Sequence, residues 1–188
     1  MAIERIRQMT VEEYFAFDEA SEYKNEYIDG EVYPMTGGTA YHAEIMINLG
    51  IALGLRLRGG GFHVYSSAMR ISVSPRRYLY PDLSIVRGEP ELDEGAINLF
   101  NPTLVAEVIS PTTASRDRGF KREQYRSIPS LQVYLVIEQF EAQVEVDSRQ
   151  GDNWQTIEYA GLDAIVPLTA LGCDLPLAEI YDGIPFAA

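Results

Sequence analysis

Two nearly continuous apolar runs, separated by a polar stretch, constrain the fold of this chain more than any other feature. Residues 104–109, Leu-Val-Ala-Glu-Val-Ile, predict a buried central strand, and Leu131 to Ile137 predict another. The polar segment Ser115 to Ser127 lies between them and stops at Ile128-Pro129, which indicates a helix. A helix between two buried strands is typical of a βαβ crossover, so we expect an α/β domain.

Capping and turn signals predict the elements nearer the N-terminus. Thr10 and Glu13 have the spacing of a capping box, so a short helix is expected over residues 10–20. Residues 23–35 alternate around an Asp-Gly pair, which predicts a hairpin of two short antiparallel strands. Apolar residues recur at helical spacing over residues 40–58, and a glycine triplet then ends that helix.

The remaining segments predict further strands and one loop. Short strands are expected at residues 63–66, 70–73, 79–86, 143–147 and 154–159, with a last short helix at 177–181. Residues 88–102 are rich in Gly, Pro, Asp and Glu, which is typical of a solvent-exposed loop. We therefore expect a mixed central β-sheet flanked by helices, in a single domain of residues 1–188.

Composition limits which sites and locations are open to the chain. The single Cys173 excludes an intramolecular disulfide and a cysteine-cluster zinc site, and two histidines argue against a histidine-rich one. Carboxylates must therefore hold any metal. No apolar run of about 18 residues exists, and the N-terminus lacks the apolar stretch of a signal peptide. These absences predict a cytoplasmic protein with no membrane partner.

The net charge of −13 argues against a protein that coats nucleic acid through bulk electrostatics. Ten of the fifteen basic residues nevertheless fall within residues 56–77 and 116–126. A locally basic face is compatible with a phosphate-bearing substrate, and ordinary solvated surface explains it as well.

Two carboxylates stand inside strand-forming sequence, Asp82 just after Pro81 and Glu107 between Ala106 and Val108. Burying an ionised carboxylate is costly unless it is paired or binds a cation. If the two acids meet, each raises the pKa of the other, and a divalent cation relieves that repulsion. Mg²⁺ fits best and Mn²⁺ is an alternative. The other interpretation is that each acid pairs with a buried arginine or caps a turn.

Five sequence pieces, taken in order, carry a resemblance to a known family. They are Glu26 to Val32, Tyr41 to Ile45, Tyr80-Pro81-Asp82, Val105 to Pro111 and Asp117 to Tyr125. With these pieces the chain resembles the Uma-two family, a bacterial branch of the PD-(D/E)XK nuclease superfamily, over a core of about residues 10–160. The resemblance implies a restriction-endonuclease-like fold.

The resemblance also implies a set of site residues. Asp82 and Glu107 match the family's metal-binding acids, and the Val108 carbonyl is a candidate third ligand. The superfamily's usual lysine lies two residues after the second acid, where this chain has Ile109. The resemblance implies that Lys121, on the following helix, takes over the role of that lysine.

Further candidates surround these residues. On a helix, Gln124 and Tyr125 share a face with Lys121, so all three could point toward the strand ends, although Lys121 could also be a solvated charge. Glu26 matches an auxiliary acid that could be a further ligand or pair with a cation. Arg116, Arg118 and Arg122 are candidate phosphate contacts, whereas His42 is expected to be a cap or packing residue.

The implied function is that of a Mg²⁺-dependent endonuclease that hydrolyses DNA phosphodiester bonds. The metal would lower the pKa of a bound water, and Lys121 would orient that water or neutralise charge in the transition state. The alternative is a catalytically inactive copy of the fold that serves as a binding or regulatory module. A homodimer is compatible with either function, with the peripheral strands after residue 140 as candidates for pairing between subunits.

Overall fold

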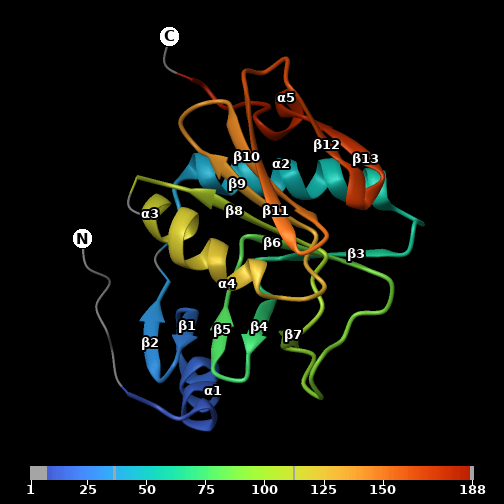
Figure 1. Cartoon of the computed structure of the whole chain (residues 1–188). Helices are drawn as coiled ribbons and strands as arrows, with labels where there is room; N and C mark the ends of the chain where they lie inside the picture. The colour runs from blue at the N-terminus through green and yellow to red at the C-terminus, as the bar shows by residue number, and fades with distance from the viewer. Residues whose placement is uncertain (1–7, 36, 112, 187–188) are drawn as a thin grey trace.

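The predicted βαβ unit lies at the centre of the computed structural model, which describes residues 8–35, 37–111 and 113–186. β8 (Leu104–Ile109) runs parallel to β9 (Val133–Glu138), and the crossover helix between them covers one face of the pair (Figure 1). Every residue of β8 is buried. The predicted central strands and crossover are therefore confirmed.

A six-stranded mixed sheet is built around this unit, in the order β11-β10-β9-β8-β6-β3. The added strands are β3 (Phe62–Ser66), β6 (Leu83–Arg87), β10 (Gln143–Gln150) and β11 (Asn153–Ala160), and all of them pair antiparallel. The alternating sequence predicted two peripheral strands here, and β10 and β11 confirm them; the structure adds that they pair with each other as a hairpin.

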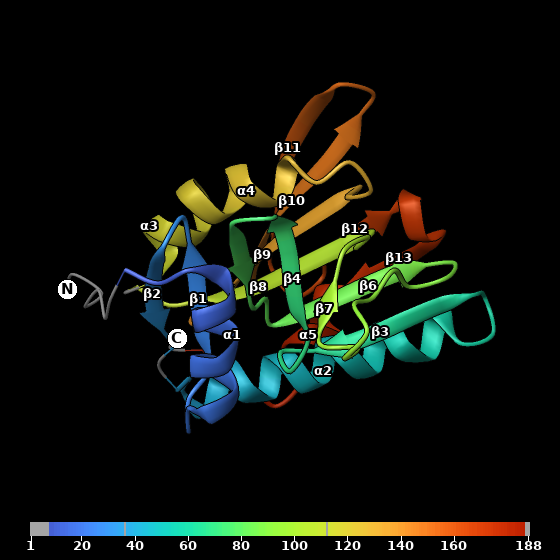
Figure 2. The same cartoon turned by 90° about the horizontal axis from the view of Figure 1, so that it is seen from below.

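Helices cover both faces of this sheet, as Figure 2 shows with α2 (Ala40–Leu57) on one side and the crossover on the other. Alternation along β8 divides its side chains between the two layers. Leu104, Ala106 and Val108 belong to the apolar cluster under α2. Val105 and Ile109 belong to the cluster that contains Tyr125 of the crossover. Glu107 therefore faces the crossover helix.

A second, five-stranded sheet has the order β2-β1-β5-β4-β7. Its strands are β1 (Asn25–Ile28), β2 (Glu31–Pro34), β4 (Arg70–Ser74), β5 (Arg77–Leu79) and β7 (Asn98–Leu99). α1 (Val11–Ala20) begins with the predicted Thr10–Glu13 capping box and buries Tyr14 against Tyr27 and Tyr78. The predicted hairpin is also present, because Asp29 and Gly30 adopt positive φ angles and turn β1 into β2.

Two expectations need correction, and one hairpin was missed. The strand expected at residues 79–86 is two strands in different sheets, β5 and β6, because Pro81 has no N–H to continue a ladder. The loop at residues 88–102 contains the short buried strand β7. The hairpin of β12 (Ile165–Leu168) and β13 (Cys173–Pro176), which packs under α2 with α5 (Leu177–Ile180), was not predicted.

The crossover helix is irregular. It consists of α3 (Ala114–Arg116), one π-helical turn, η1 (Asp117–Lys121), and α4 (Arg122–Arg126). π-helical turns are rare and occur frequently at functional sites. Within the described residues, no helix is both long and apolar enough to cross a membrane.

The packing of β9 between both helical layers makes a test of the fold. Leu135 is fully buried under α2, so Leu135→Ala should lower the free energy of unfolding by about 2–5 kcal/mol. Urea unfolding followed by circular dichroism measures the change. Leu162→Ala removes the same atoms from an exposed position and should cost less than about 0.5 kcal/mol. Equal losses in the two variants would contradict this packing.

Candidate active site

The junction of the two sheets and the crossover helix gathers five buried ionisable side chains. Glu26 comes from β1, Glu107 from β8, and Asp117 and Lys121 from η1. Asp82 comes from the segment that joins β5 to β6. Each of the five residues keeps 7% or less of its surface exposed. The two acids predicted to form a site, Asp82 and Glu107, and the predicted lysine therefore lie in one buried cluster.

Lys121 is the centre of this cluster. Its Nζ lies 2.9 Å from Oε1 of Glu26 and 2.9 Å from Oε1 of Glu107, and 3.7 Å from Oδ1 of Asp117. The Tyr125 hydroxyl donates a 3.0 Å hydrogen bond to the same Glu107 oxygen. Lys121 and Tyr125 thus point toward β8 from one helical face, as the sequence predicted. The interpretation of Lys121 as a solvated charge is wrong, because its ammonium is buried.

Asp82 is held by two contacts of a single oxygen. Its Oδ2 accepts a 2.7 Å hydrogen bond from the backbone N–H of Val108 and lies 3.1 Å from Nε2 of His42. Leu83 of β6 pairs with Ala106 of β8, and the Asp82 carboxylate contacts the amide that follows Glu107, so Asp82 lies beside Glu107. The group of Val108 that meets Asp82 is its amide. A ligand role for the Val108 carbonyl stays a prediction.

His42 differs from its expected role. Its backbone N–H is capped by Thr39, but its ring extends from the first turn of α2 to Asp82. That hydrogen bond raises the pKa of His42, against the opposing effect of burial. The sequence placed His42 correctly at a helix start. It held no signal that this helix end would lie beside Asp82, because that proximity depends on how α2 packs across the sheet.

Negative charge exceeds positive charge in the cluster. Burial raises the pKa of Glu107 well above its ordinary value, and repulsion from Asp117, Asp82 and Glu26 adds to this, while Lys121 opposes it. Burial alone would lower the pKa of Lys121, but Glu107, Glu26 and Asp117 together raise it. Lys121 therefore stays an ammonium at neutral pH. Lys121, together with Arg116 beside Glu26, supplies two positive charges against four acids, and His42 adds a third only when it is protonated. The cluster therefore favours a further cation.

The donor set fits Mg²⁺ in chemical type and in charge. Among the described residues, no three His, Cys, Asp or Glu side chains converge on one point that could hold a metal ion. Mg²⁺ does not need such a cage, because it is usually bound through one or two carboxylates together with water and substrate phosphate. Asp82 and Glu107 each use only one carboxylate oxygen in the contacts described above. Each therefore has a second oxygen for a cation.

Arg116 lies at the edge of the cluster. Its guanidinium is 2.7 Å from Oε2 of Glu26, and its side chain is 23% exposed. The contact has the distance of an ion pair but not the alignment of a hydrogen bond, so Oε2 of Glu26 has no hydrogen-bond partner among the residues that the structure describes. Arg116 is therefore the candidate phosphate contact that the structure brings to the site, whereas Arg118 and Arg122 lie elsewhere.

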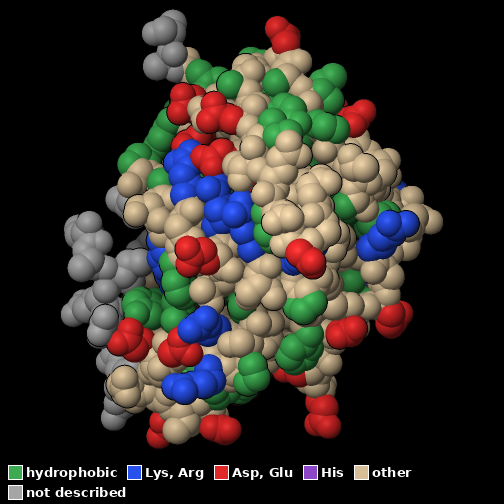
Figure 3. Space-filling view, in the orientation of Figure 1, with side chains coloured by type: hydrophobic (Ala, Val, Ile, Leu, Met, Phe, Trp, Pro, Cys, Tyr) green, Lys and Arg blue, Asp and Glu red, His purple; other side chains and the backbone are tan. Residues whose placement is uncertain are grey.

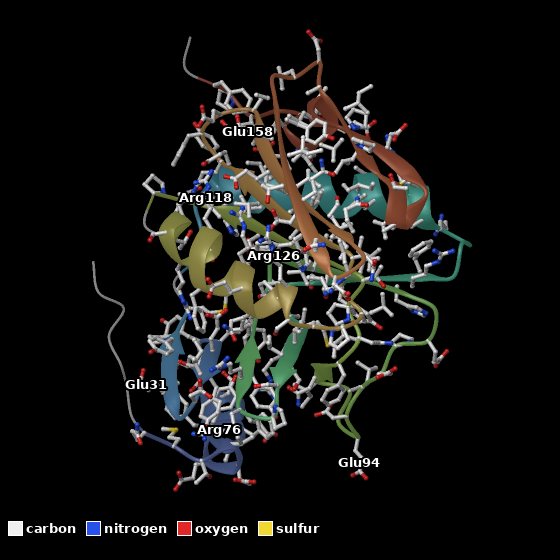
Figure 4. All side chains as sticks on the ribbon, viewed as in Figure 1. Glu31, Arg76, Glu94, Arg118, Arg126 and Glu158 are labelled. Carbon is white, nitrogen blue, oxygen red and sulfur yellow. The ribbon has the colours of Figure 1, made fainter. Side chains whose placement is uncertain are left out.

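Arg118 and Arg122 instead pair with acids of β9 and β10. Arg118 contacts Glu138 and Glu145, and Arg122 contacts Glu145 and Asp147. Figure 3 shows a band of basic side chains in this region, where Figure 4 labels Arg118 and Arg126. Gln124 also lies away from the cluster, since its side chain accepts a hydrogen bond from Arg77.

The mixed sheet with its βαβ crossover, covered by helices on both faces, defines an α/β protein. The chain belongs to the Uma2 family, described as "Putative restriction endonuclease", whose model matches residues 11–178. This confirms the resemblance found in the sequence. Membership of this family supports a nuclease-type function.

Three known proteins illustrate this relationship. "Uncharacterized protein sll1609" from Synechocystis sp. is 34% identical over 87% of this chain and 94% of its own length. "Uncharacterized protein slr1290" from the same organism is 30% identical over 95% of this chain and 94% of its own. A crystal structure from Anabaena variabilis, described as "a putative nuclease belonging to DUF820", superposes with a TM-score of 0.75 at 18% identity. The superposition covers 92% of this chain and 97% of the Anabaena variabilis chain, so the two proteins share the fold.

The ion pairs around Glu145 predict a pH-dependent stability. Burial raises the pKa of Glu145, but hydrogen bonds from Arg122 and Arg118 outweigh burial and hold the pKa below its ordinary value. A lowered folded-state pKa gives stability that is present above the unfolded value and lost as the pH falls through the folded value. Glu145→Gln should therefore lower the free energy of unfolding by about 1 kcal/mol at pH 7.

That deficit should shrink at pH 3, because protonation of Glu145 weakens the same ion pairs in the unmodified chain. Urea unfolding at pH 7 and pH 3 measures it. Glu158→Gln, at an exposed position on β11, is the matched control and should change little at either pH. A deficit of equal size at both pH values would contradict the assignment.

Proposed function

We propose that this protein hydrolyses phosphodiester bonds in DNA with Mg²⁺ as cofactor, and that Mn²⁺ can replace Mg²⁺. Asp82 and Glu107 would hold the metal, and Lys121 would be the catalytic cation. One observation carries the proposal: the Asp82 carboxylate accepts a hydrogen bond from the amide of Val108, the residue after Glu107, and the Lys121 ammonium lies 2.9 Å from Glu107. Membership of the Uma2 family supports the reaction class.

When bound, Mg²⁺ would supply a Lewis acid that lowers the pKa of water and offsets charge on the phosphate. The chain's own contacts would orient the ligands. The Val108 amide and His42 fix one oxygen of Asp82, and Tyr125 and Lys121 fix one oxygen of Glu107. These contacts leave the second oxygens in place for the metal without further reorganisation of the carboxylates.

Lys121 would act on the substrate from its position beside Glu107. A phosphate that approaches a cation held by Glu107 comes within reach of the Lys121 ammonium. The ammonium could then donate a hydrogen bond to a phosphate oxygen or orient the attacking water. Ile109, at the position of the superfamily's usual lysine, is fully buried among apolar side chains. Lys121, on the π-helical turn η1, would therefore supply the amine that is missing at position 109 of β8.

Arg116 would contact a phosphate next to the scissile one. It is partly exposed and pairs only with Glu26 among the described acids. Arg118 and Arg122 are weaker candidates, because their charges are already compensated by Glu138, Glu145 and Asp147.

One observation favours a second function, that of a catalytically inactive module that binds DNA or regulates another protein. Lys121 contacts one oxygen of Glu26 and one oxygen of Glu107, so the chain itself supplies a cation to both acids. In that case neither metal binding nor cleavage would be observed, and any DNA binding would be independent of Mg²⁺ and of Asp82.

Metal binding should depend on Asp82. Asp82→Asn keeps the shape of the side chain and removes its charge, so it should weaken Mg²⁺ and Mn²⁺ binding at least about 100-fold. Isothermal titration calorimetry measures the affinity. Asp163→Asn, at an exposed acid, is the matched control and should bind like the unmodified chain. Equal affinities in the unmodified chain and the Asp82 variant would place the metal elsewhere, and no binding in either would favour the inactive module.

Cleavage should depend on Lys121 more than metal binding does. Lys121→Met keeps the length of the side chain and removes the ammonium, so nicking of supercoiled plasmid should fall by about 100- to 1,000-fold. Metal affinity should persist, because the acids lose a competing positive charge. Arg76→Met, at an exposed cation, should retain activity. If Lys121→Met abolished metal binding and cleavage together while the fold was kept, the proposed division of roles would be wrong.

A further inference from the structure

Helix α2 carries an apolar ridge on its outer face. Its inner face is buried under the sheet through Ile45, Leu49, Ala52, Leu53 and Leu57. On the other side Ile47, Ile51 and Leu55 are 61%, 55% and 67% exposed. These three residues recur every four positions, so they form one row along the helix. Single exposed apolar residues are ordinary, but a row of three large ones marks an interaction surface.

A hollow of about 250 Å³ lies beside this ridge, lined by Gly50, Gly54 and their neighbours Ile51, Leu55 and Arg58. Glycine inside a helix costs about 1 kcal/mol relative to alanine. Among the described atoms, a Cβ on Gly54 would meet nothing within 4 Å, and one on Gly50 would make only an ordinary contact. Packing within one chain therefore does not require either glycine. A second helix that approaches closely would require both.

The charges at the two ends of the ridge indicate that the second helix is α2 of another copy of this chain. Glu44 and Arg58 are exposed and lie seven residues before and after Ile51, about two helical turns in each direction. Among the described residues neither forms an ion pair. If two copies of α2 cross antiparallel about a two-fold axis at Ile51, Glu44 of each copy lies opposite Arg58 of the other. In the same arrangement Ile47 lies opposite Leu55.

We propose that this protein forms a homodimer through antiparallel packing of α2 on α2. The surface is self-complementary in shape, with a ridge beside a hollow, and in charge, with opposite signs at its two ends. Each chain carries a net charge of −13, so two copies repel each other. The repulsion is weakest where the apolar ridge of one copy packs against that of the other. The edge strand β3 runs alongside α2 (Figure 2), so the interface can extend beyond the helices toward the area that a stable dimer needs.

Sedimentation velocity of the full chain tests the proposal. The unmodified chain should sediment as a dimer at micromolar concentration. Leu55→Glu places two like charges at the interface and should raise the dimer dissociation constant at least about 100-fold, without loss of fold because Leu55 is exposed. Ile157→Glu makes the same kind of change at an exposed position on β11, the opposite edge of the sheet, and should leave the dimer intact.

A charge exchange tests the orientation of the two helices. Glu44→Arg alone should weaken the dimer, and Glu44→Arg combined with Arg58→Glu should restore it. A monomeric unmodified chain, a dimer that survives Leu55→Glu, or a dimer that Ile157→Glu breaks would overturn the proposal. Failure of the double exchange to restore the dimer would overturn the antiparallel register. None of these measurements involves metal or cleavage, so their outcome is independent of the proposed nuclease activity.

Discussion

The site depends on the ion pairs that the buried ammonium of Lys121 forms with Glu26 and Glu107. This ammonium joins three elements that are far apart in the chain, because it contacts Glu26 on β1 and Glu107 on β8 from the π-helical turn η1. Burying an ion pair offers little net stability, since desolvation offsets most of the attraction, yet removal of one partner leaves an uncompensated charge. The cluster therefore contributes little to the stability of the fold. The fold instead holds these side chains in place for a functional role.

The two-sheet architecture explains why acids can meet at this point. The chain leaves the smaller sheet at Leu79 and enters the larger one at Leu83, and Pro81 prevents a continuous strand. Asp82 therefore lies just before β6 rather than within it, and its carboxylate accepts a hydrogen bond from the Val108 amide. Alternation along β8 turns Glu107 to the same side, toward the crossover helix. The proposed metal affinity follows from this enforced proximity of like charges.

Much of this arrangement could be predicted from the sequence, and the remainder depends on tertiary packing. Continuous apolar runs identified β8 and β9, a polar stretch identified the crossover, and capping and turn residues located α1 and the first hairpin. Helical spacing correctly grouped Lys121 with Tyr125. It also grouped Gln124 with them, but the Gln124 side chain accepts a hydrogen bond from Arg77 of β5, outside the cluster, and this partner depends on tertiary packing. Two features have no local sequence signal. One is the contact between His42 and Asp82, and the other is the π-helical turn η1.

Anomalous diffraction from crystals soaked in Mn²⁺ tests the central claim most directly, because it locates the cation and Lys121 together. The account predicts one peak between Asp82 and Glu107, with carboxylate oxygens at about 2.0–2.6 Å from the metal, and a Lys121 ammonium that remains beside the site. A cluster without an anomalous peak, in which Lys121 still bridges Glu26 and Glu107 at saturating Mn²⁺, would contradict it.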